Sequence, residues 1–368
     1  MKYLKYLVLG LLLSLLTGCW GHYDIEKVGP DLQLGIERSK NGRILLTAAH
    51  PIFGTAKKNQ DETASMECDI LREARESNRR ISALIPEAGR LQQCLFSAEL
   101  ARRGLFPWLE IFERDPLDPP HALVVITDGS PKELMEQAVL FKDKPRPALY
   151  IQNLLLNNRD QYAAIYRIID FNIAYFAPGL DPVAPIVKLG PKGIRLTGTA
   201  LFCGDRMVGL IDPEETSLLL AMMGRLRGAE YIFRHPASVP GEGRRKPAAA
   251  VRIAKVKRKI KIRIHDGRPE AAISLNFAGV LDEYHWNRMD RLQSEKNLEQ
   301  SFTAELNQRC NRLIQHLQSA GSDPIGVGDL IRANHYQYWK SFNPESVYKT
   351  ARIIVKAKFK ITQYGAIK

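Results

Sequence analysis

The sequence predicts an α/β protein with α+β character, built as a three-domain body of mixed sheets with flanking helices behind a cleaved export signal. Three observations support this fold class. An uncharged, leucine-rich stretch stands near the start of the chain. A continuous apolar strand at 122–127 leads through a turn into a capped helix. The last third contains long segments in which apolar and basic residues alternate strictly.

The length of 368 residues exceeds the size at which one hydrophobic core usually stops growing, so the chain should divide into domains. Residues 1–18 are the predicted lipoprotein signal peptide, and 19–177 form an N-terminal α/β domain. A small middle domain, a hairpin plus a helix, is expected at 178–236. The C-terminal domain at 248–368 should be a mixed sheet with long helices on one face.

The first twenty residues carry the clearest chemical signal. Lys2 and Lys5 precede an uncharged core at 6–16 of about 11 residues, whereas about 20 are needed to span a bilayer as a helix. A basic head and a short apolar core are typical of an export signal. Leu16-Thr17-Gly18-Cys19 resembles the lipobox of bacterial lipoproteins, in which the cysteine thiol receives a diacylglycerol. An ordinary secretory signal and an uncleaved anchor are the alternatives.

The net charge of +13, which falls to +11 once Lys2 and Lys5 are removed, favours anionic neighbours. These include phospholipid headgroups, wall polymers and acidic protein faces. Nucleic acid also attracts basic proteins, but an exported protein rarely meets it, so we expect no nucleic-acid partner.

The cysteines other than Cys19 lie far apart among apolar neighbours, and none stands in C-x-x-C spacing. This argues against a zinc ribbon and a thioredoxin-like motif. Buried free thiols are favoured over a disulfide between any two of them. The four are Cys68, Cys94, Cys203 and Cys310.

The N-terminal elements begin with a hairpin. Strands at 32–36 and 44–50 flank Asn41-Gly42, which is a strong hairpin signal. From Thr63 to Leu84, apolar residues three, four or seven apart predict an amphipathic helix. A strand at 91–97 should then enter short helices.

After the strand at 122–127, Ser130, Pro131 and Glu133 predict a helix start, with Ser130 as its cap rather than a nucleophile. The density of proline and glycine at 178–193 indicates a linker or domain crossing. Beyond it, strands at 194–202 and 207–211 and a helix from Pro213 are expected.

The C-terminal third should be a sheet with helices on one face. Period-two alternation at 254–264, 273–277 and 353–361 predicts half-buried strands. Between the second and third strands, an amphipathic stripe at 298–317 predicts a long helix, and 323–339 a turn plus a second helix.

If the strands at 254–264 and 352–360 share a sheet, their basic residues share one face. That face is a candidate contact for an anionic surface, either lipid or an acidic partner loop. The favoured alternative is a solvated face, because lysine commonly protects sheet edges from pairing. The residues are Lys255, Lys257, Lys259, Lys261, Arg263, Arg352, Lys356, Lys358 and Lys360.

Catalytic motifs are missing from the sequence. It has no H-E-x-x-H, no G-x-x-x-x-G-K-[ST] and no Cys/His metal spacing. Glu99, Arg114 and Asp115 are candidates for a polar cluster, although helix-surface charges or an ion pair explain them more simply. We therefore expect no catalytic residue, no cofactor and no metal ion.

Four blocks, taken in order, resemble the Ger(x)C family, the lipoprotein C subunits of spore germinant receptors in endospore-forming bacteria. The blocks are Leu16 to Trp20; Ser97 to Leu105 with Glu113 to Pro116; Leu196 to Phe202 with Met207 to Ile211; and Asp323 to Gly328 with Trp339. The resemblance implies a body of three α/β domains and two integral-membrane partners, an A subunit and a transporter-like B subunit.

Together these features predict a lipid-anchored, non-catalytic subunit of a nutrient germinant receptor complex, acting in spore germination. Its location would be the extracytoplasmic face of a membrane, the inner spore membrane, with lipid attached through Cys19. The alternative is an extracytoplasmic solute-binding lipoprotein that delivers a small nutrient to a permease. That function would need a deep cleft with convergent polar groups.

Overall fold

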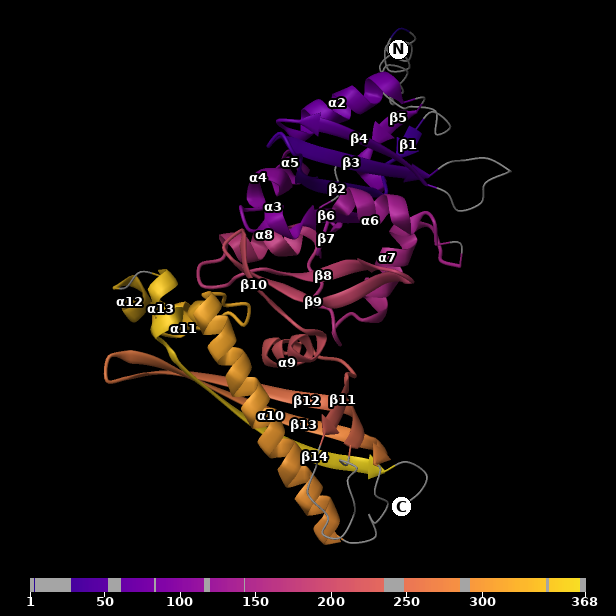
Figure 1. Cartoon of the computed structure of the whole chain (residues 1–368). Helices are drawn as coiled ribbons and strands as arrows, with labels where there is room; N and C mark the ends of the chain where they lie inside the picture. Colours follow the sequence, from indigo (N-terminus) through magenta and orange to yellow (C-terminus); the bar gives the residue numbers. More distant parts are fainter. Residues whose placement is uncertain are drawn as a thin grey trace.

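The computed structural model describes residues 3, 28–51, 61–82, 84–115, 120–141, 143–234, 248–284, 292–341 and 344–364. These residues form two lobes on either side of helix α9 (Pro213–Met223), as Figure 1 shows. The N-terminal lobe is built on an eight-stranded sheet and the C-terminal lobe on a four-stranded sheet. Mixed sheets with flanking helices confirm the predicted fold class. Apart from Tyr3, the predicted signal peptide at 1–18 lies outside the described residues, and so do Cys19 and residues 236–247.

The N-terminal lobe has a parallel centre with antiparallel additions at both edges. The central strands β2 (Gln33–Arg38), β6 (Gln93–Ser97) and β7 (Leu123–Thr127) pair in parallel. All five residues of β7 are buried, as predicted for a strand covered on both faces. The full order is β10 (Arg206–Ile211), β9 (Gly193–Cys203), β8 (Val183–Gly190), β7, β6, β2, β3 (Ile44–Pro51) and β4 (Asp61–Cys68).

Helices cover both faces of this sheet. One face packs against α6 (Pro131–Ala138) and α7 (Pro147–Asn157), and the core between them includes Leu95 and Val125. The opposite face, including Phe96 and Val124, packs with the remaining helices of the lobe. These are α2 (Leu71–Ile81), α3 (Ala98–Ala101), α4 (Phe106–Leu109), α5 (Ile111–Arg114) and α8 (Ile168–Phe176).

Several local predictions for this lobe are confirmed. Strands β2 and β3 form the hairpin around Asn41-Gly42, with Gly42 at a φ of +88°. Ser130 caps α6, because its Oγ accepts a hydrogen bond from the Glu133 N–H at 3.1 Å. The Ser130 hydroxyl also donates to Glu37 at 2.7 Å. Ser130 is therefore engaged as a structural cap.

Two predictions were wrong. Residues 63–68 belong to strand β4 rather than to the helix, which starts only at Leu71. Thr63 and Ser65 pair with β3, and the Ser65 and Thr47 hydroxyls lie 2.9 Å apart, so cross-strand pairing outweighs the helical spacing. The predicted linker contains β8, in which Pro185 pairs with Thr199. The eight-stranded sheet thus continues across residue 177. The division into domains at 19–177, 178–236 and 248–368 stays a prediction.

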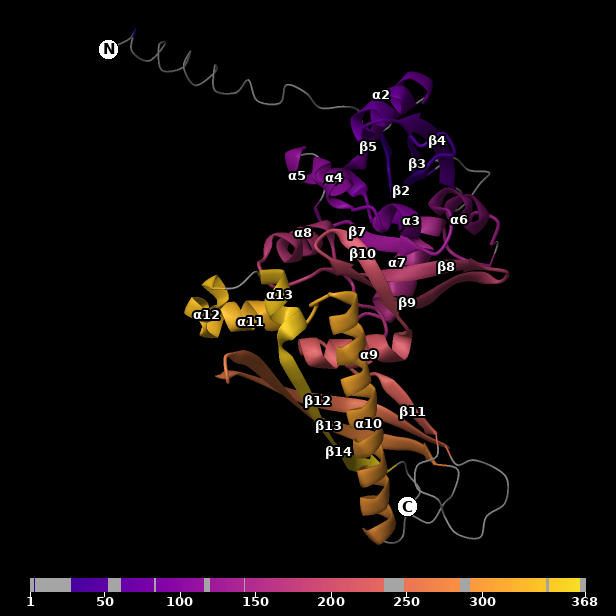
Figure 2. The ribbon, with the colours of Figure 1, turned by 60° about the vertical axis from the view of Figure 1, so that its left-hand side comes forward.

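The C-terminal lobe follows its predicted order. Strands β12 (Ala248–His265), β13 (Arg268–Tyr284) and β14 (Arg352–Tyr364) form the sheet, and the short β11 (Glu230–Arg234), which we did not predict, is added to β12. The long helix α10 (Leu292–Ala320) crosses one face (Figures 1 and 2). The remaining helices are α11 (Val327–Asn334), α12 (Tyr336–Lys340) and α13 (Pro344–Thr350).

Aromatic rings form the centre of the C-terminal core. Phe302 of α10 stacks on Phe233 of β11 with ring centroids 4.2 Å apart, and it meets the edge of Phe359 of β14 at 5.4 Å. The inward residues of β13 and β14 complete this core. Because one face of the sheet is buried in this way, the other face is left to carry the basic residues.

Candidate functional site

The first strand, β1 (Val28–Pro30), pairs in parallel with β5 (Ile85–Glu87). Cys19 lies outside the described residues, so lipid attachment stays a prediction. The two figures place β5 and α2 at one end of the molecule and the four-stranded sheet at the other (Figures 1 and 2). No helix among the described residues is long and apolar enough to cross a membrane.

The structure places the predicted basic residues on one face of the four-stranded sheet. Residues that pair across neighbouring strands point to the same face. Asn276 of β13 pairs with Lys257 of β12 on one side and with Lys358 of β14 on the other. Ser274 and Ala278 connect the next two lysine pairs in the same way. The basic face is Lys255, Lys257, Lys259, Lys261 and Arg263 from β12, with Arg352, Lys356, Lys358 and Lys360 from β14.

The basic face is exposed to solvent and has few acidic neighbours. All nine of its cationic residues are exposed. At one end, Glu270 of β13 lies beside Arg263 and 3.7 Å from Arg352, which reduces the local charge. Within the part of the chain that the structure describes, none of the seven lysines forms an ion pair. The lysines therefore form two unneutralised rows, with the small residues of β13 between them.

The rows have a regular spacing fixed by sheet geometry. Lysines along one strand stand about 6.7 Å apart, and the rows on β12 and β14 lie about 9.6 Å apart, because one strand separates them. A two-dimensional array of cations at this spacing is suited to a flat surface that carries many anionic groups. A single small anion would use only a fraction of it.

Edge protection explains the lysines of β12 but not those of β14. Strand β11 pairs only with Ala248–Arg252, so the rest of β12 is an open edge within the described chain. The outer edge of β14 is instead occupied by polar side chains of α10. Backbone N–H groups of β14 donate at 2.8 to 3.2 Å to a stripe of acceptors that recur every four residues: Glu299, Thr303, Asn307 and Asn311. The lysines of β14 therefore need another explanation.

The three candidate polar residues of the N-terminal lobe are not brought together. Glu99 pairs with Arg103 at 3.4 Å, and Arg114 pairs with Glu110 at 3.1 Å, both along their own helical segments. Asp115 accepts from Arg72 at 2.6 Å and from Arg75 at 3.1 Å. Only the Asp115 pairs join two elements, α2 and the end of α5, and the three residues form no common site.

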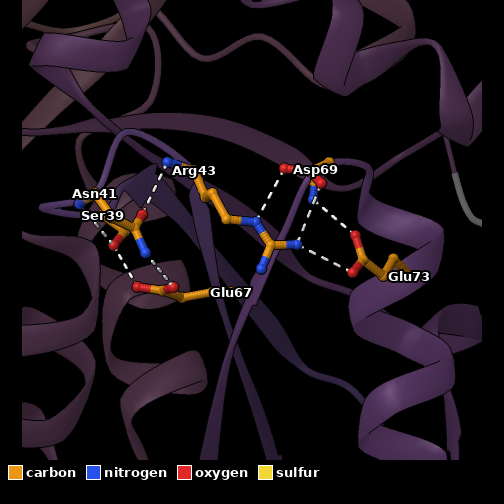
Figure 3. A network of polar contacts seen from close by, with 6 residues as sticks. All are labelled: Ser39, Asn41, Arg43, Glu67, Asp69 and Glu73. Carbon is orange, nitrogen blue, oxygen red and sulfur yellow. Dashed lines mark hydrogen bonds and ion pairs between the residues drawn. The ribbon is translucent and has the colours of Figure 1, made fainter.

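A larger polar network fixes the tip of the β2–β3 hairpin (Figure 3). The Glu67 carboxylate accepts hydrogen bonds from Ser39 and Asn41, and these donors hold its pKa below the usual range. Arg43 bridges Asp69 at 2.9 Å and Glu73 at 3.0 Å. Because these carboxylates are used to join the hairpin, β4 and α2, the network serves as a structural clasp.

A buried carboxylate organises the junction of the two lobes. Asp323 follows α10, and its oxygens accept hydrogen bonds from the N–H groups of Gly326 and Val327 at 2.9 and 3.0 Å and of Gly328 at 2.7 Å. Its own N–H donates to Asp181 at 2.7 Å, and Asp181 also accepts from Gly204 at 2.8 Å. Burial raises the pKa of Asp323 to about 7, against the opposing effect of the three N–H donors.

The junction also requires close backbone packing. Gly179 has a φ of +81°, and a methyl group on it would meet Gly328, Asp329 and Trp339 at 2.6 to 2.8 Å. The Gly179 carbonyl accepts from the Asp329 N–H at 2.9 Å. The sequence block from Asp323 to Gly328 with Trp339 therefore holds the lobes together. Nothing in the sequence singled out Asp181 or Gly179 as its partners.

The four described cysteines are not joined by disulfide bonds, and three of them are buried. Burial raises the pKa of the Cys68 thiol to about 11 and that of Cys310 to about 12, so both stay protonated at neutral pH. Within the described residues, no group of three or more His, Cys, Asp or Glu side chains is arranged to hold a metal ion.

Matches to known protein families cover nearly the whole chain. A model described as spore germination protein N-terminal domain matches residues 21–189, and one described as spore germination B3/GerAC like, C-terminal, matches 197–365. Spore germination protein GerQC of Bacillus cereus is 24% identical over 76% of either chain. Spore germination protein B3 of Bacillus subtilis (strain 168) is 21% identical over 99% of this chain and 98% of that protein.

The fold agrees with these matches. A crystal structure of the GerBC protein aligns with a TM-score of 0.58 and 19% identity, covering 92% of this chain and 99% of that one. The two lobes and the matched models define the class of the molecule as a spore germination protein. The chain belongs to the Ger(x)C family, as the four sequence blocks indicated.

Proposed function

We propose that the protein is a lipid-anchored, non-catalytic subunit of a nutrient germinant receptor complex. It would act with an integral-membrane A subunit and a transporter-like B subunit on the extracytoplasmic face of the inner spore membrane. The observation that carries this proposal is Cys19 at the end of Leu16-Thr17-Gly18, in a chain whose family match runs from 21 to 365.

The physics of anchoring supports this arrangement. Two acyl chains on one cysteine give stable membrane attachment, whereas a single chain gives only marginal binding. Residues 19–27 can reach at most about 30 Å when fully extended, so the lipid would keep β1 near the bilayer. The body would then meet its membrane partners by diffusion in the plane of the membrane.

We expect Cys19→Ala to release the protein from membranes and to abolish its co-purification with a multi-span membrane protein from spores. The matched control is Cys203→Ala, which removes a half-buried thiol in β9 and should leave both properties unchanged. Incorporation of labelled palmitate should be lost only in the first variant. A complex that is retained in full without the lipid would show that protein contacts, rather than the anchor, hold this subunit.

We further propose that the basic face contacts anionic phospholipid headgroups while the body lies along the membrane. The two lysine rows and the occupied edge of β14 support this. Because the sheet lies at the opposite end of the molecule from β1, the contact would fix the tilt of a body already tethered at its other end (Figure 1). Such a contact is weakened by salt, since it depends on charge.

Neutralising Lys257, Lys259, Lys356 and Lys358 to glutamine should weaken binding of the lipid-free body to anionic vesicles roughly 1,000-fold at low salt. This follows from about 1 kcal/mol per lysine near an anionic surface. Vesicle co-sedimentation against lipid concentration measures it. The control changes the same net charge elsewhere, with Arg79, Arg80, Arg102 and Arg103 replaced by glutamine. If the unaltered body does not bind anionic vesicles at low salt, the lipid contact is excluded and an acidic protein surface takes its place.

A further inference from the structure

A concave region lies in the N-terminal lobe, away from the basic face. A pocket of about 460 Å³ opens between α7, α8 and the segment 158–167, and Arg225 enters it from the end of α9. Its volume is within the range of about 300 to 1,000 Å³ typical of small-molecule sites. Polar and apolar side chains share its walls. The polar ones include Arg159, Arg167 and Arg225, and the apolar ones include Leu156, Ile173 and Leu180.

Arg225 is held in place within this pocket. Its Nη2 atom donates to the carbonyl of Ile165 at 3.1 Å and to the Asp160 carboxylate at 3.3 Å. The guanidinium group also lies over the ring of Tyr166, 5.4 Å from its centroid. Both hydrogen bonds use the same nitrogen, and a guanidinium has five N–H donors. The N–H groups of Nη1 and Nε are not used by these two bonds, and they can donate to an anion from separate edges of the guanidinium.

The backbone beneath Arg225 is strained. Asp160 has a φ of +57°, which is uncommon for a residue other than glycine. Its carbonyl accepts from the Arg227 N–H at 2.7 Å, and its carboxylate lies 3.6 Å from Arg159. Strain of this kind persists where surrounding contacts fix the conformation, and it is frequent at ligand sites. Here it turns the 158–167 segment toward the end of α9.

The net charge and the lining residues of the pocket restrict the chemical class of ligand that it can bind. Three guanidinium groups and the Asp170 carboxylate line the pocket, and Arg167 and Asp170 are joined at 2.8 Å. A second carboxylate, Asp160, pairs with Arg159 and Arg225 from outside the lining. The net charge of +1 matches a monoanion. Among the apolar lining residues, Leu156 is 43% exposed and Ile173 is 60% exposed, so both present apolar surface that a ligand can cover.

We propose that this pocket binds a small monocarboxylate with a short apolar body. The carboxylate pairs with Arg225 and Arg159, and the apolar body covers Leu156 and Ile173. This site is independent of the lipid anchor and of the basic face, because it lies on the N-terminal lobe and uses none of their residues. The soluble body from residue 20 onward is therefore sufficient to test it.

Hexanoate titrated into the soluble body should bind saturably in isothermal calorimetry, with a Kd of about 1 mM or tighter for a ligand of this size. Hexanamide, which has the same shape without the charge, should bind at least 10-fold more weakly. Ile173→Asp should also weaken hexanoate at least 10-fold, because it adds a carboxylate at an exposed position without disturbing the core. Arg225→Lys should do the same, since lysine keeps the charge but lacks the separate Nε and Nη1 donors.

The control variant is Arg114→Gln, which removes a mostly exposed arginine far along the chain from the pocket and should leave binding unchanged. Absence of saturation at about ten times the expected Kd overturns the proposal. Equal binding of hexanoate and hexanamide also overturns it, as does unchanged binding in Ile173→Asp. None of these results affects Cys19, whose role is measured by membrane retention.

Discussion

Asp323→Ala should lower the free energy of unfolding by about 3 to 5 kcal/mol. The substitution removes the acceptor for three backbone N–H groups at the start of α11, in a site where Asp323 itself is 2% exposed. Buried donors left without partners cost their full desolvation energy. Because Asp323 lies at the lobe junction, where its backbone N–H also donates to Asp181, the loss should appear first as proteolytic cleavage near that junction.

The size of this effect should depend on pH. An unfolded aspartate has a pKa of about 4, whereas burial raises the pKa of Asp323 to about 7 in the folded protein. Between these values the folded state binds more protons than the unfolded state, so the stability supplied by Asp323 falls as the pH rises. The difference between the wild-type protein and Asp323→Ala should therefore be largest near pH 4 and smaller above pH 7.

Urea unfolding followed by circular dichroism, repeated across this pH range, measures both parts of the prediction. Asp329→Ala is the matched control on the same helix, because that carboxylate is 39% exposed and its ion-pair partner among the described residues is Arg332 at 2.7 Å. It should cost less than about 1 kcal/mol. If the two variants unfold at the same urea concentration, Asp323 does not hold the junction.

Local periodicity predicted much of the fold, but it failed where partners are distant in sequence. The hairpin at Asn41-Gly42 and the alternating strands β12 and β14 are encoded within a few positions. Their predicted structures are therefore confirmed. Residues 63–68 have helical spacing, yet pairing with β3 makes them a strand. Strand β8 contains Pro185. Proline favours a turn in sequence-based prediction, but here Pro185 pairs with Thr199 within the strand.

The candidate sites divide in the same way. The basic face could be predicted because a period-two pattern determines which residues share a face, and only the strand order had to be guessed. The junction could not be predicted, because Asp181 and Asp323 lie 142 positions apart and no local sequence pattern links them. The pocket likewise depends on Arg225 reaching a loop 60 residues earlier. Such contacts follow from packing of the lobes rather than from local sequence.

The remaining large effect is expected at Gly198, in the third sequence block. Strands β8 and β9 shift register here, so that Ile186 pairs with Gly198 and Val187 with Leu196, which leaves Thr197 as a bulge. Gly198 has a φ of +142°, and a methyl group on it would overlap the backbone carbonyl of Ile211. Neither the dihedral nor the backbone contact can be relieved by a side-chain movement.

Gly198→Ala should therefore destabilise the protein by about 4 kcal/mol or more, which is among the largest effects of a single substitution. Gly209→Ala in the adjacent β10 is the matched control. A methyl group there would lie 3.6 Å from its nearest neighbour, Leu201, which is an ordinary contact. Thermal unfolding should separate the two variants clearly. A similar melting temperature for both would mean that the bulge can shift its register, and the block around Gly198 would then have to be explained by a contact outside this chain.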